Sequence, residues 1–322
     1  MDLLGTPVSE IQSLIMQEKL LITREAYNEL HYMYAPARLS NVIHKIDISS
    51  PVLYKKITED SKASIKQSLY TDDDSNISLT TEYDSTELPE GTLAYHRIVG
   101  PVMSDSRWWF STTQFEQDFL FAESNPQISG HFIFCNSPGG DAYYLDRVSE
   151  TIRNRKKPLY VLIKKVCCSA AYYICCHGDI VKSITQNDTI GSIGTMISFL
   201  DWDSYDKKNG INRIEYKATK SILKNKKIDD LIAGKPKQFI EEELDPINEQ
   251  FINEVKSSRK LIKNFDDSNP VLAGETFRAS IAMTSDCGLI DGISTLPDAI
   301  KEAYNLGQKF LQNRRASITK LI

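Results

Sequence analysis

Two short segments of the chain carry residue types that could together act on a carbonyl group. The segment NSPGGD contains Gly139 and Gly140, and the segment CCSAAY contains Ser169 and Ala170. Each follows an apolar stretch typical of a buried strand and precedes a helical stretch. If the two loops are neighbours, an N–H of one glycine and the N–H of Ala170 could converge on one oxygen as an oxyanion hole. Ser169 would then stand beside that hole as a nucleophile.

A serine nucleophile needs a base, and the sequence offers lysine more readily than histidine. Of the five histidines only His177 follows Ser169, and it lies about 12 Å further along the axis of the same short helix. A lysine base has to be neutral, so burial must bring its pKa from about 10.4 to near 7. At most one lysine of the segment EYKATKSILKNKKIDD is the base, and the others belong to a solvated surface. The candidates are Lys217, Lys220, Lys224, Lys226 and Lys227.

Each of these features also has a purely structural interpretation. A serine before a helix is commonly its N-cap, and two glycines after a proline are commonly a turn. The six cysteines lie mostly in or beside apolar runs, and their spacing does not match the usual zinc sites. We expect reduced thiols that pack as small apolar side chains, with metal or redox chemistry as the alternative. No metal and no cofactor is predicted.

From Leu93 onward the sequence alternates between stretches typical of strands and stretches typical of helices. The predicted strands cover residues 93–103, 130–140, 157–166, 179–184, 189–202 and 212–218. The predicted helices cover residues 141–155, 169–178 and 235–261, the last interrupted near Pro246. This alternation predicts an α/β layered domain with a largely parallel sheet.

The first 88 residues differ in character from the rest. Residues 9–33 have the apolar spacing of an amphipathic helix, whereas residues 70–91 are acidic, rich in turn formers and without a sustained apolar period. The sequence therefore predicts an N-terminal extension made of a helix and an exposed acidic loop or linker.

Composition and charge exclude several classes of protein. The chain has 322 residues, of which 41% are hydrophobic, enough for a globular core. Its 38 basic and 43 acidic residues give a net charge of −5, which argues against a nucleic-acid-binding protein. No apolar run is long enough to span a bilayer, and the opening residues MDLLGTPVSEIQSL lack a basic-then-apolar signal pattern. We expect a cytoplasmic protein without a membrane anchor.

Four motifs, in order along residues 90 to 305, resemble those of the signal peptide peptidase A family of Ser–Lys proteases. They are the NSPGG turn at 136–140, CSAAYYIC at 168–175, DIV at 179–181 followed by GSIG at 191–194, and the closing GETFRASIAMTSDCGLIDGI at 274–293. The resemblance implies the crotonase-like fold of the caseinolytic protease ClpP, a layered β-β-α superhelix. It also implies a Ser–Lys protease domain at 89–305, between the N-terminal extension (1–88) and a C-terminal tail (306–322).

The resemblance also implies roles for individual residues. Ser169 matches the family's nucleophile, and Gly140, with Gly139 close by, and Ala170 match the oxyanion donors. The family's general-base lysine lies about fifty residues after the serine, which makes Lys224 the first candidate and Lys220 the second. Ala170-Ala171 replaces the usual Gly-Gly pair, and no glycine follows KAT in the lysine segment. Family members form rings, and in several of them the serine and the lysine come from neighbouring subunits.

The sequence thus predicts an ATP-independent serine endopeptidase that assembles as a ring-shaped homo-oligomer. The expected substrates are peptides or proteins, in extended apolar segments, and the predicted role is signal-peptide-peptidase-like or, as in prophage relatives, capsid-maturation-like. Two alternatives stay open. One is a catalytically inactive structural or assembly protein of the same fold, and the other is a crotonase-type acyl-CoA enzyme that uses a carboxylate as its acid or base.

Overall fold

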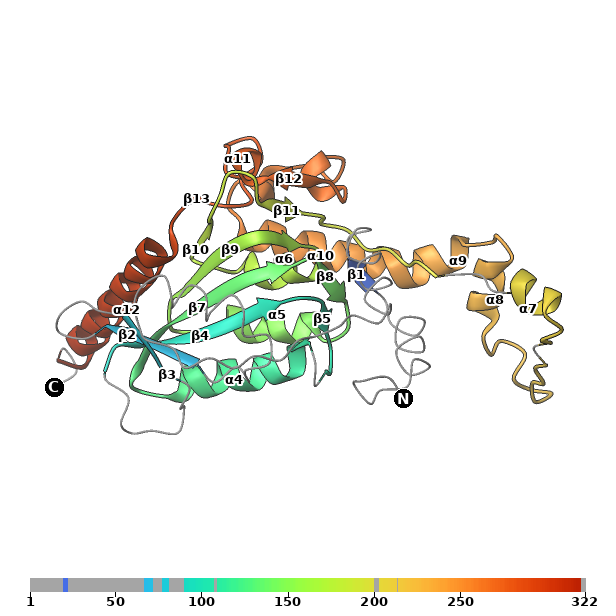
Figure 1. Cartoon of the computed structure of the whole chain (residues 1–322), viewed down its shortest axis with the longest axis horizontal. Coiled ribbons are helices and arrows are strands. Elements are labelled where there is room, and N and C mark those ends of the chain that lie inside the picture. The colour runs from blue at the N-terminus through green and yellow to red at the C-terminus, as the bar shows by residue number, and fades with distance from the viewer. Residues whose placement is uncertain are drawn as a thin grey trace.

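The fold is built around a sheet of mainly parallel strands (Figure 1). The computed structural model describes residues 90–106, 109–199, 203–212 and 214–319, together with three strands that precede them. These three are β1 (Leu20–Ile22), β2 (Gln67–Thr71) and β3 (Ile77–Thr80). The main sheet has the order β12-β11-β9-β7-β4-β2-β3, with β10 and β13 continuing beside β9.

Three parallel strands form the centre of this sheet: β4 (Thr92–Val99), β7 (Ile128–Ser137) and β9 (Leu159–Cys168). Their sequences are almost continuously apolar because helices cover both faces. One face packs against α4 (Thr112–Ser124), α5 (Leu145–Arg153) and α6 (Ala170–Cys175), and the other against α12 (Leu296–Thr319). The layered α/β architecture expected from the sequence is confirmed.

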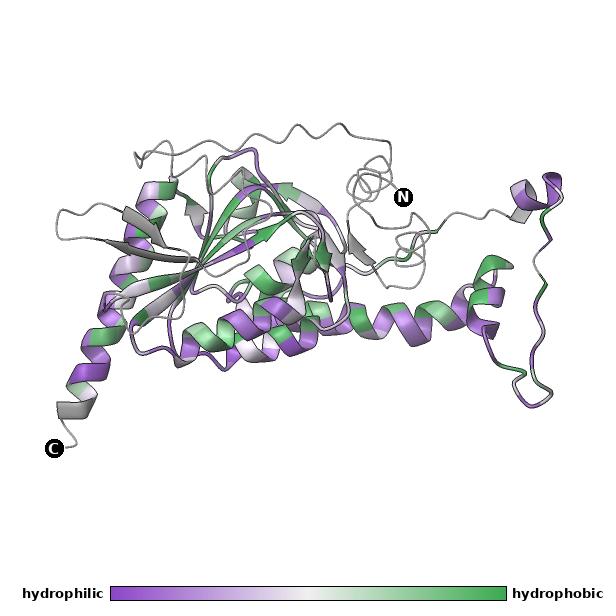
Figure 2. Ribbon diagram, turned by 60° about the horizontal axis from the view of Figure 1, so that its bottom comes forward, coloured by the Kyte–Doolittle hydropathy of each residue, from purple (hydrophilic) through white to green (hydrophobic). Residues whose placement is uncertain are grey.

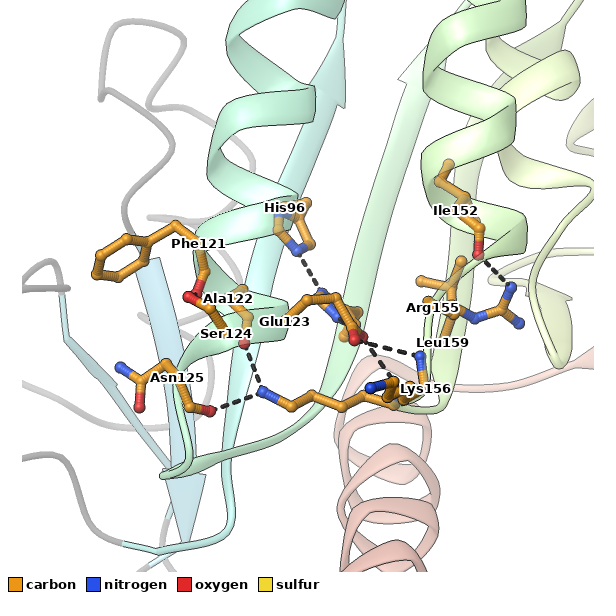
Figure 3. Close-up of polar contacts among 12 residues, drawn as sticks. His96, Phe121, Ala122, Glu123, Ser124, Asn125, Ile152, Arg155, Lys156 and Leu159 are labelled. Atoms are coloured by element: carbon orange, nitrogen blue, oxygen red, sulfur yellow. Dashed lines mark hydrogen bonds and ion pairs between the residues drawn. The ribbon is translucent and has the colours of Figure 1, made fainter.

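A chain of buried polar contacts fixes α4 to the sheet (Figure 3). His96 Nε2 lies 3.0 Å from His131 Nδ1, and His131 Nε2 lies 2.9 Å from the Glu123 carboxylate at the end of α4. Lys157 Nζ donates to the carbonyl oxygens of Ala122 and Asn125, at 2.5 and 2.7 Å. These bonds satisfy carbonyl groups at the C-terminal end of α4, which a helix leaves without partners of its own.

A second, smaller sheet lies beyond the carboxyl ends of the central strands. Its order is β1-β8-β5-β6, with β5 (Val102–Met103), β6 (Phe110–Ser111) and β8 (Gly139–Asp141). The glycine turn that follows β7 is therefore itself a short strand, paired with β5 on one side and with β1 on the other.

A long helical segment leaves the body of the molecule and ends in an arm (Figures 1 and 2). The segment consists of α9 (Lys237–Phe239), the π-helical turn η1 (Ile240–Leu244) and α10 (Asp245–Ser258). Phe251 and Val255 of α10 are fully buried in the core. At its far end lies the arm, residues 203–212 and 214–236, with α7 (Asp203–Lys208) and α8 (Lys226–Ile232).

The remaining elements close the sheet on the β9 side. They are β10 (Ile180–Ser183), β11 (Thr189–Gly191), η2 (Ile262–Asn264), η3 (Pro270–Leu272), β12 (Thr276–Arg278), α11 (Ala279–Ala282) and β13 (Gly292–Ile293). Among the helices that the structure describes, none combines the length and the apolar character needed to cross a bilayer.

Several predicted elements are wrong. Residues 20–22, in the middle of the predicted helix 9–33, form strand β1, and the rest of that helix lies outside the described residues. The predicted acidic linker contributes the end of β2 and all of β3, which pair antiparallel. Residues 214–218 form no strand, and the strand predicted to run through residue 202 ends at Gly191. Pro246 does not interrupt the helix, because it lies in the first turn of α10, where no acceptor needs its missing N–H.

The domain boundaries stay predictions. Strand β2 of the predicted extension pairs with β4 of the predicted protease domain. Helix α12 runs from Leu296 to Thr319 without a break at residue 305, where the C-terminal tail was expected to begin.

Candidate active site

An irregularity in β9 brings the two candidate loops together. The β7–β9 register pairs Cys135 with Ile163 but Ser137 with Cys167, so β9 contains two extra residues at this point. Lys165 lies inside this bulge with a φ of 70°. Bulges bend a strand and redirect the side chains beyond it. The bulge therefore places the end of β9, and with it Ser169, beside the turn that leads into the glycine strand β8.

The backbone at Ser169 has a conformation that side-chain-bearing residues rarely adopt. Its φ is 55° and its ψ is −127°, at a sharp turn between β9 and α6. The Ser169 N–H donates to the Gly191 carbonyl oxygen at 2.9 Å, and the Ser169 carbonyl accepts from Tyr173 N–H at 2.9 Å. A strained strand-to-helix turn of this kind is how α/β-hydrolases present a nucleophilic serine.

The Ser169 side chain is held without a partner. Its Oγ is buried and makes no hydrogen bond in the structure, and no N-capping bond forms between Oγ and the first turn of α6. The N-cap interpretation of Ser169 therefore has no support from the geometry. A buried unpaired hydroxyl costs about 1–3 kcal/mol, a cost that makes sense where a reacting group has to stay available.

Strand β8 needs its glycines for two different reasons. Gly139 has a φ of 101°, which favours glycine, and its N–H donates to Ser137 Oγ at 3.2 Å. Gly140 approaches β5 so closely that a Cβ atom there would lie 1.9 Å from the Val102 carbonyl oxygen. Asp141, fully buried, anchors the end of the strand by accepting from Ser104 N–H at 3.2 Å and from Tyr143 N–H at 2.8 Å.

The structure brings the predicted oxyanion donors and the nucleophile into adjoining segments. Ala170 is the first residue of α6, so its N–H is one of the donors that a helix leaves without an acceptor in its own backbone. Helix α6 contacts strand β8, which carries Gly140. Because the Gly139 N–H already serves Ser137, Gly140 is the better candidate of the two glycines for the second donor.

Among the residues that the structure describes, no lysine makes a hydrogen bond with Ser169 Oγ. Lys220 and Lys224 are exposed on the arm, at the far end of the long helix from α6 (Figure 1). The other lysines of this segment are engaged: Lys217 with Asp229 at 2.8 Å, Lys227 with Glu242 and Glu243, and Lys226 with Asp230. Lys220 and Lys224 make no ion pair within the described part of the chain. The two lysines suggested as the base are thus the two left unpaired.

The other motif residues hold the site in place. The Gly191 carbonyl fixes the Ser169 N–H, and a Cβ at Gly191 would lie 2.8 Å from the Glu275 carbonyl oxygen. In the closing motif, Asp291 accepts from Val181 N–H at 2.7 Å and pairs with Arg259 at 2.7 Å. Tyr172 of α6 donates to the Leu289 carbonyl at 2.7 Å. These contacts tie the Ser169 helix to the last motif of the chain.

A second group of serine, histidine and glutamate lies in the core, and sequence reasoning missed it. Ser149 Oγ donates to the Glu254 carboxylate at 2.7 Å and lies 2.8 Å from His177 Nε2, while Ser258 Oγ lies 2.8 Å from His177 Nδ1. Since the single Ser149 proton goes to Glu254, Ser149 accepts from Nε2–H, and Ser258 donates to Nδ1. Every group is satisfied with a neutral histidine, so this is a buried structural link between α5, the turn that follows α6, and α10.

Three buried cysteines cluster beneath the candidate site. The sulfur atoms of Cys135, Cys167 and Cys175 all lie within 4.8 Å of one another. Burial raises the pKa of the Cys167 and Cys175 thiols, which opposes the thiolate form that a metal ion requires. Burial also acts to raise the pKa of the Cys135 thiol, but hydrogen bonds with Cys167 and Cys175 outweigh it and lower that pKa to about 5, so only one of the three sulfur atoms is readily ionised. The cluster lies within the main apolar core and fits the packing interpretation of these residues.

Comparison with known proteins extends these observations. Residues 151–309 match the model of peptidase family S49. This stretch contains the Ser169 turn, the GSIG turn, the arm and the closing motif. The match covers 159 of the 322 residues, just under half of the chain. The match supports the resemblance that the sequence motifs indicated.

Two further likenesses accompany the S49 match. A protein named as a candidate signal peptide peptidase SppA from Enterococcus faecium is 28% identical over 208 residues, 59% of this chain and 56% of that protein. The chain thus spans a little over half the length of this curated relative. A solved structure of a ClpP1 mutant from Listeria monocytogenes aligns with 64% of this chain and 93% of its own, at 15% identity and a TM-score of 0.38.

Proposed function

We propose that the chain is an ATP-independent serine endopeptidase in which Ser169 is the nucleophile and Lys224 of a neighbouring copy is the general base. Lys220 is the alternative base. The observation that carries the proposal is the Ser169 side chain: a buried, unpartnered hydroxyl on a strained turn, next to a glycine strand, in a stretch that matches the S49 family model. A serine kept in this way lacks only a base, and Lys220 and Lys224 on the arm make no ion pair within the described residues.

The reaction would proceed through an acyl-enzyme. The neutral amine of Lys224 takes the Oγ proton as Oγ attacks the peptide carbonyl, and the N–H groups of Gly140 and Ala170 receive the oxyanion. The lysine proton then passes to the leaving amine as the C–N bond breaks. Water, deprotonated by the same lysine, attacks the ester, and collapse of the second tetrahedral intermediate returns the proton to Oγ. The products are a carboxylic acid and an amine, so the net change is the addition of one water molecule.

The position of the arm favours a base supplied by another copy. In the described part of the chain the arm contacts the body only through its connections, the long helix on one side and residues 192–199 on the other (Figure 1). Its lysines are exposed, whereas a lysine needs an apolar, water-poor setting to be neutral near pH 7. Docking of the arm against a second copy would supply that setting. The ring assembly expected from the family resemblance is the natural form of such contacts.

A complementation experiment tests this arrangement. Ser169→Ala and Lys224→Ala chains are each expected to lose peptide cleavage, whereas co-assembly of the two should restore it. A Ser169→Ala chain still offers its lysine to the intact serine of a Lys224→Ala neighbour. Random mixing in equal amounts should recover about a quarter of the wild-type activity. The measurement is hydrolysis of a fluorogenic peptide library, with Lys220→Ala in the same scheme to decide between the two bases.

Three results would decide against parts of the proposal. Mixed assemblies as inactive as their parents would place the base in the same chain as the serine. An Ser169→Ala protein that cleaves as fast as the parent would remove the serine mechanism. Ordered assembly without any labelling of Ser169 by a fluorophosphonate would favour the non-catalytic assembly protein, the alternative suggested by the Ala170-Ala171 pair. The extended apolar substrates, the cytoplasmic location and the prophage-type role stay predictions.

A further inference from the structure

The glycine strand β8 has a neighbour that comes from the distant N-terminal part of the chain. Strand β1 pairs antiparallel with β8, with Leu20 opposite Asp141, Leu21 opposite Gly140, and Ile22 opposite Gly139. The other side of β8 is already paired with β5. Without β1, β8 would therefore present an open edge at the site itself, and an open edge is where an extended peptide adds as a further strand.

Strand β1 runs in the same direction as a substrate whose residues before the scissile bond pair with β8. The chain of β1 runs from Asp141 towards Gly139, the end of β8 that follows Ser137. Ser137 pairs with Cys167, two residues before Ser169. Ile22 is thus the β1 residue nearest to the Ser169 turn along β8, and Leu20 is the most distant. A substrate whose scissile carbonyl sits between Gly140 and Ala170 would place its preceding residues along the same edge.

A second observation points the same way. The Ser169 residue is only 1% exposed, and its Oγ is buried and without a hydrogen-bond partner. A nucleophile that cuts peptides has to be reached by them, so the arrangement described here is closed to substrate. The edge of β8, the position that an incoming strand would take, is filled by three residues of this same chain.

We propose that the segment Leu20–Ile22 is a cis ligand of the peptide-binding edge of β8 and competes there with substrates. The inference deepens the proposed endopeptidase function and rests on it. The occupant also defines the chemistry of the edge: an extended stretch of large aliphatic residues, Leu-Leu-Ile, bound through its backbone. External peptides of the same kind have to displace it before they reach Ser169.

Proline substitution within β1 tests the proposal in the full-length, assembled protein. Residues along an antiparallel ladder alternate between hydrogen-bonded and non-hydrogen-bonded pairs. One of the two neighbours Leu21 and Ile22 must therefore donate its N–H to β8, so either Leu21→Pro or Ile22→Pro removes a hydrogen bond between β1 and β8. Leu21→Ile keeps the N–H and serves as the matched control. At least one proline variant is expected to show a KM for a fluorogenic aliphatic peptide about tenfold lower than the parent, with kcat unchanged. Labelling of Ser169 by a fluorophosphonate should accelerate by a similar factor.

A peptide and a measurement independent of activity complete the test. A synthetic peptide of residues 17–25 should inhibit the faster proline variant competitively, and the same peptide with proline at position 21 should inhibit about tenfold less well. Amide hydrogen exchange at Gly139–Asp141 should be slow in the parent and in Leu21→Ile and faster in the proline variants.

Different results would overturn the cis ligand and the endopeptidase function. Unchanged exchange at Gly139–Asp141 in both proline variants would overturn the cis ligand, whatever the activity. Faster exchange with KM and labelling rate equal to those of the parent would also overturn it, because β1 would then not compete with substrate. Faster exchange in a protein whose Ser169 is never labelled would support β1 as the occupant of β8 and refute the endopeptidase.

Discussion

Ser169 adopts a backbone conformation that the folded chain maintains at a cost. Positive φ at a residue with a side chain, outside the small left-handed region, costs on the order of 1–3 kcal/mol. Its unpaired hydroxyl adds to that cost. Bonds on both sides of the residue, from Gly191 and to Tyr173, keep the turn in this shape. Strain that persists at a buried hydroxyl, held by well-made neighbouring bonds, is more typical of a reacting group than of a packing residue.

Ser169→Gly should therefore make the protein more stable and inactive. Glycine adopts φ 55° and ψ −127° without a Cβ clash and removes the buried hydroxyl. These gains are partly offset because glycine increases the conformational freedom of the unfolded chain. We expect a net gain of about 1 kcal/mol in the free energy of unfolding. Urea unfolding measures the gain, and peptide hydrolysis measures the lost activity. A glycine variant less stable than the parent would show that the turn is not strained.

Gly140 makes a contrasting prediction, because its constraint is space. A methyl group at Gly140 meets the Val102 carbonyl oxygen at 1.9 Å and has to push β5 and β8 apart. Gly140→Ala should cost about 3 kcal/mol of stability and disturb the strand beside Ser169. Gly234→Ala on the arm, where φ is 74° and nothing lies within 4 Å, should cost only about 1 kcal/mol for its backbone conformation. Equal losses in thermal unfolding would contradict the steric argument.

At the scale of elements, the parts of the fold that sequence patterns predicted are those with local signatures. The strands around NSPGG and CCSAAY and the helices after them follow from apolar runs that end in glycine or a small-residue turn. Residues 214–218 alternate in polarity as a strand does, but they pair with no strand in the described part of the chain and therefore form none. Leu20–Ile22 fits the apolar spacing of a helix, and only the distant strand β8 makes it a strand.

The candidate site divides in the same way between local and distant information. Ser169, Gly140 and Ala170 were predicted because their own loops carry the signal. The exposure of Lys220 and Lys224 was not, because it depends on the path of the arm. Nor was the Ser149–His177–Glu254 link, whose members come from α5, from the turn after α6 and from α10, with Ser149 lying 28 residues from His177 and 105 from Glu254. An interaction between side chains separated in this way leaves no periodic pattern in the sequence.

The buried histidines that join these elements predict a loss of stability in mild acid. Burial, and the neighbouring His131, hold the pKa of His96 well below its ordinary value, and burial lowers the pKa of His177 to about 3. The folded chain then binds fewer protons than the unfolded chain, in which these groups titrate near 6.5. The stabilisation is complete above pH 6.5 and falls with pH below it, by about 1.4 kcal/mol per pH unit for each group.

Urea unfolding between pH 7.5 and 5 measures this slope. His177→Asn removes one titrating group and should make the slope shallower by about one proton, whatever its effect on stability at pH 7.5. A free energy of unfolding that stays constant between pH 7 and 5 would show that the folded state accommodates these protons.

At the scale of the whole molecule, the arm exposes an unusual amount of apolar surface. Tyr216 is 93% exposed, and Ile222 and Leu223, which lie between Lys220 and Lys224, are 74% and 72% exposed. Figure 2 shows the apolar face of α8 beside this stretch. Large exposed aliphatic groups gathered on one projecting segment are typical of protein–protein contacts. The surface is compatible with an arm that docks on another copy.

Charges introduced on the arm should therefore weaken assembly without harming the fold. Leu223→Asp is expected to shift the protein towards smaller species in sedimentation velocity, while the thermal unfolding of the body stays within about 0.5 kcal/mol of the parent. Ile281→Asp on α11, at a residue that is 49% exposed, is the matched control and should leave the assembly intact. Identical sedimentation of the parent and both variants would show that the arm takes no part in the contact between copies.

The projecting arm has a consequence for how such a protein would be governed in a cell. In the proposed arrangement, with the hydroxyl in one polypeptide and the amine in the next, each isolated chain would be half a catalyst. Turnover per molecule would then rise with abundance and vanish on dilution, by mass action alone. The rate of synthesis would then control activity. A newly made chain would cleave nothing until enough further copies had accumulated to assemble with it.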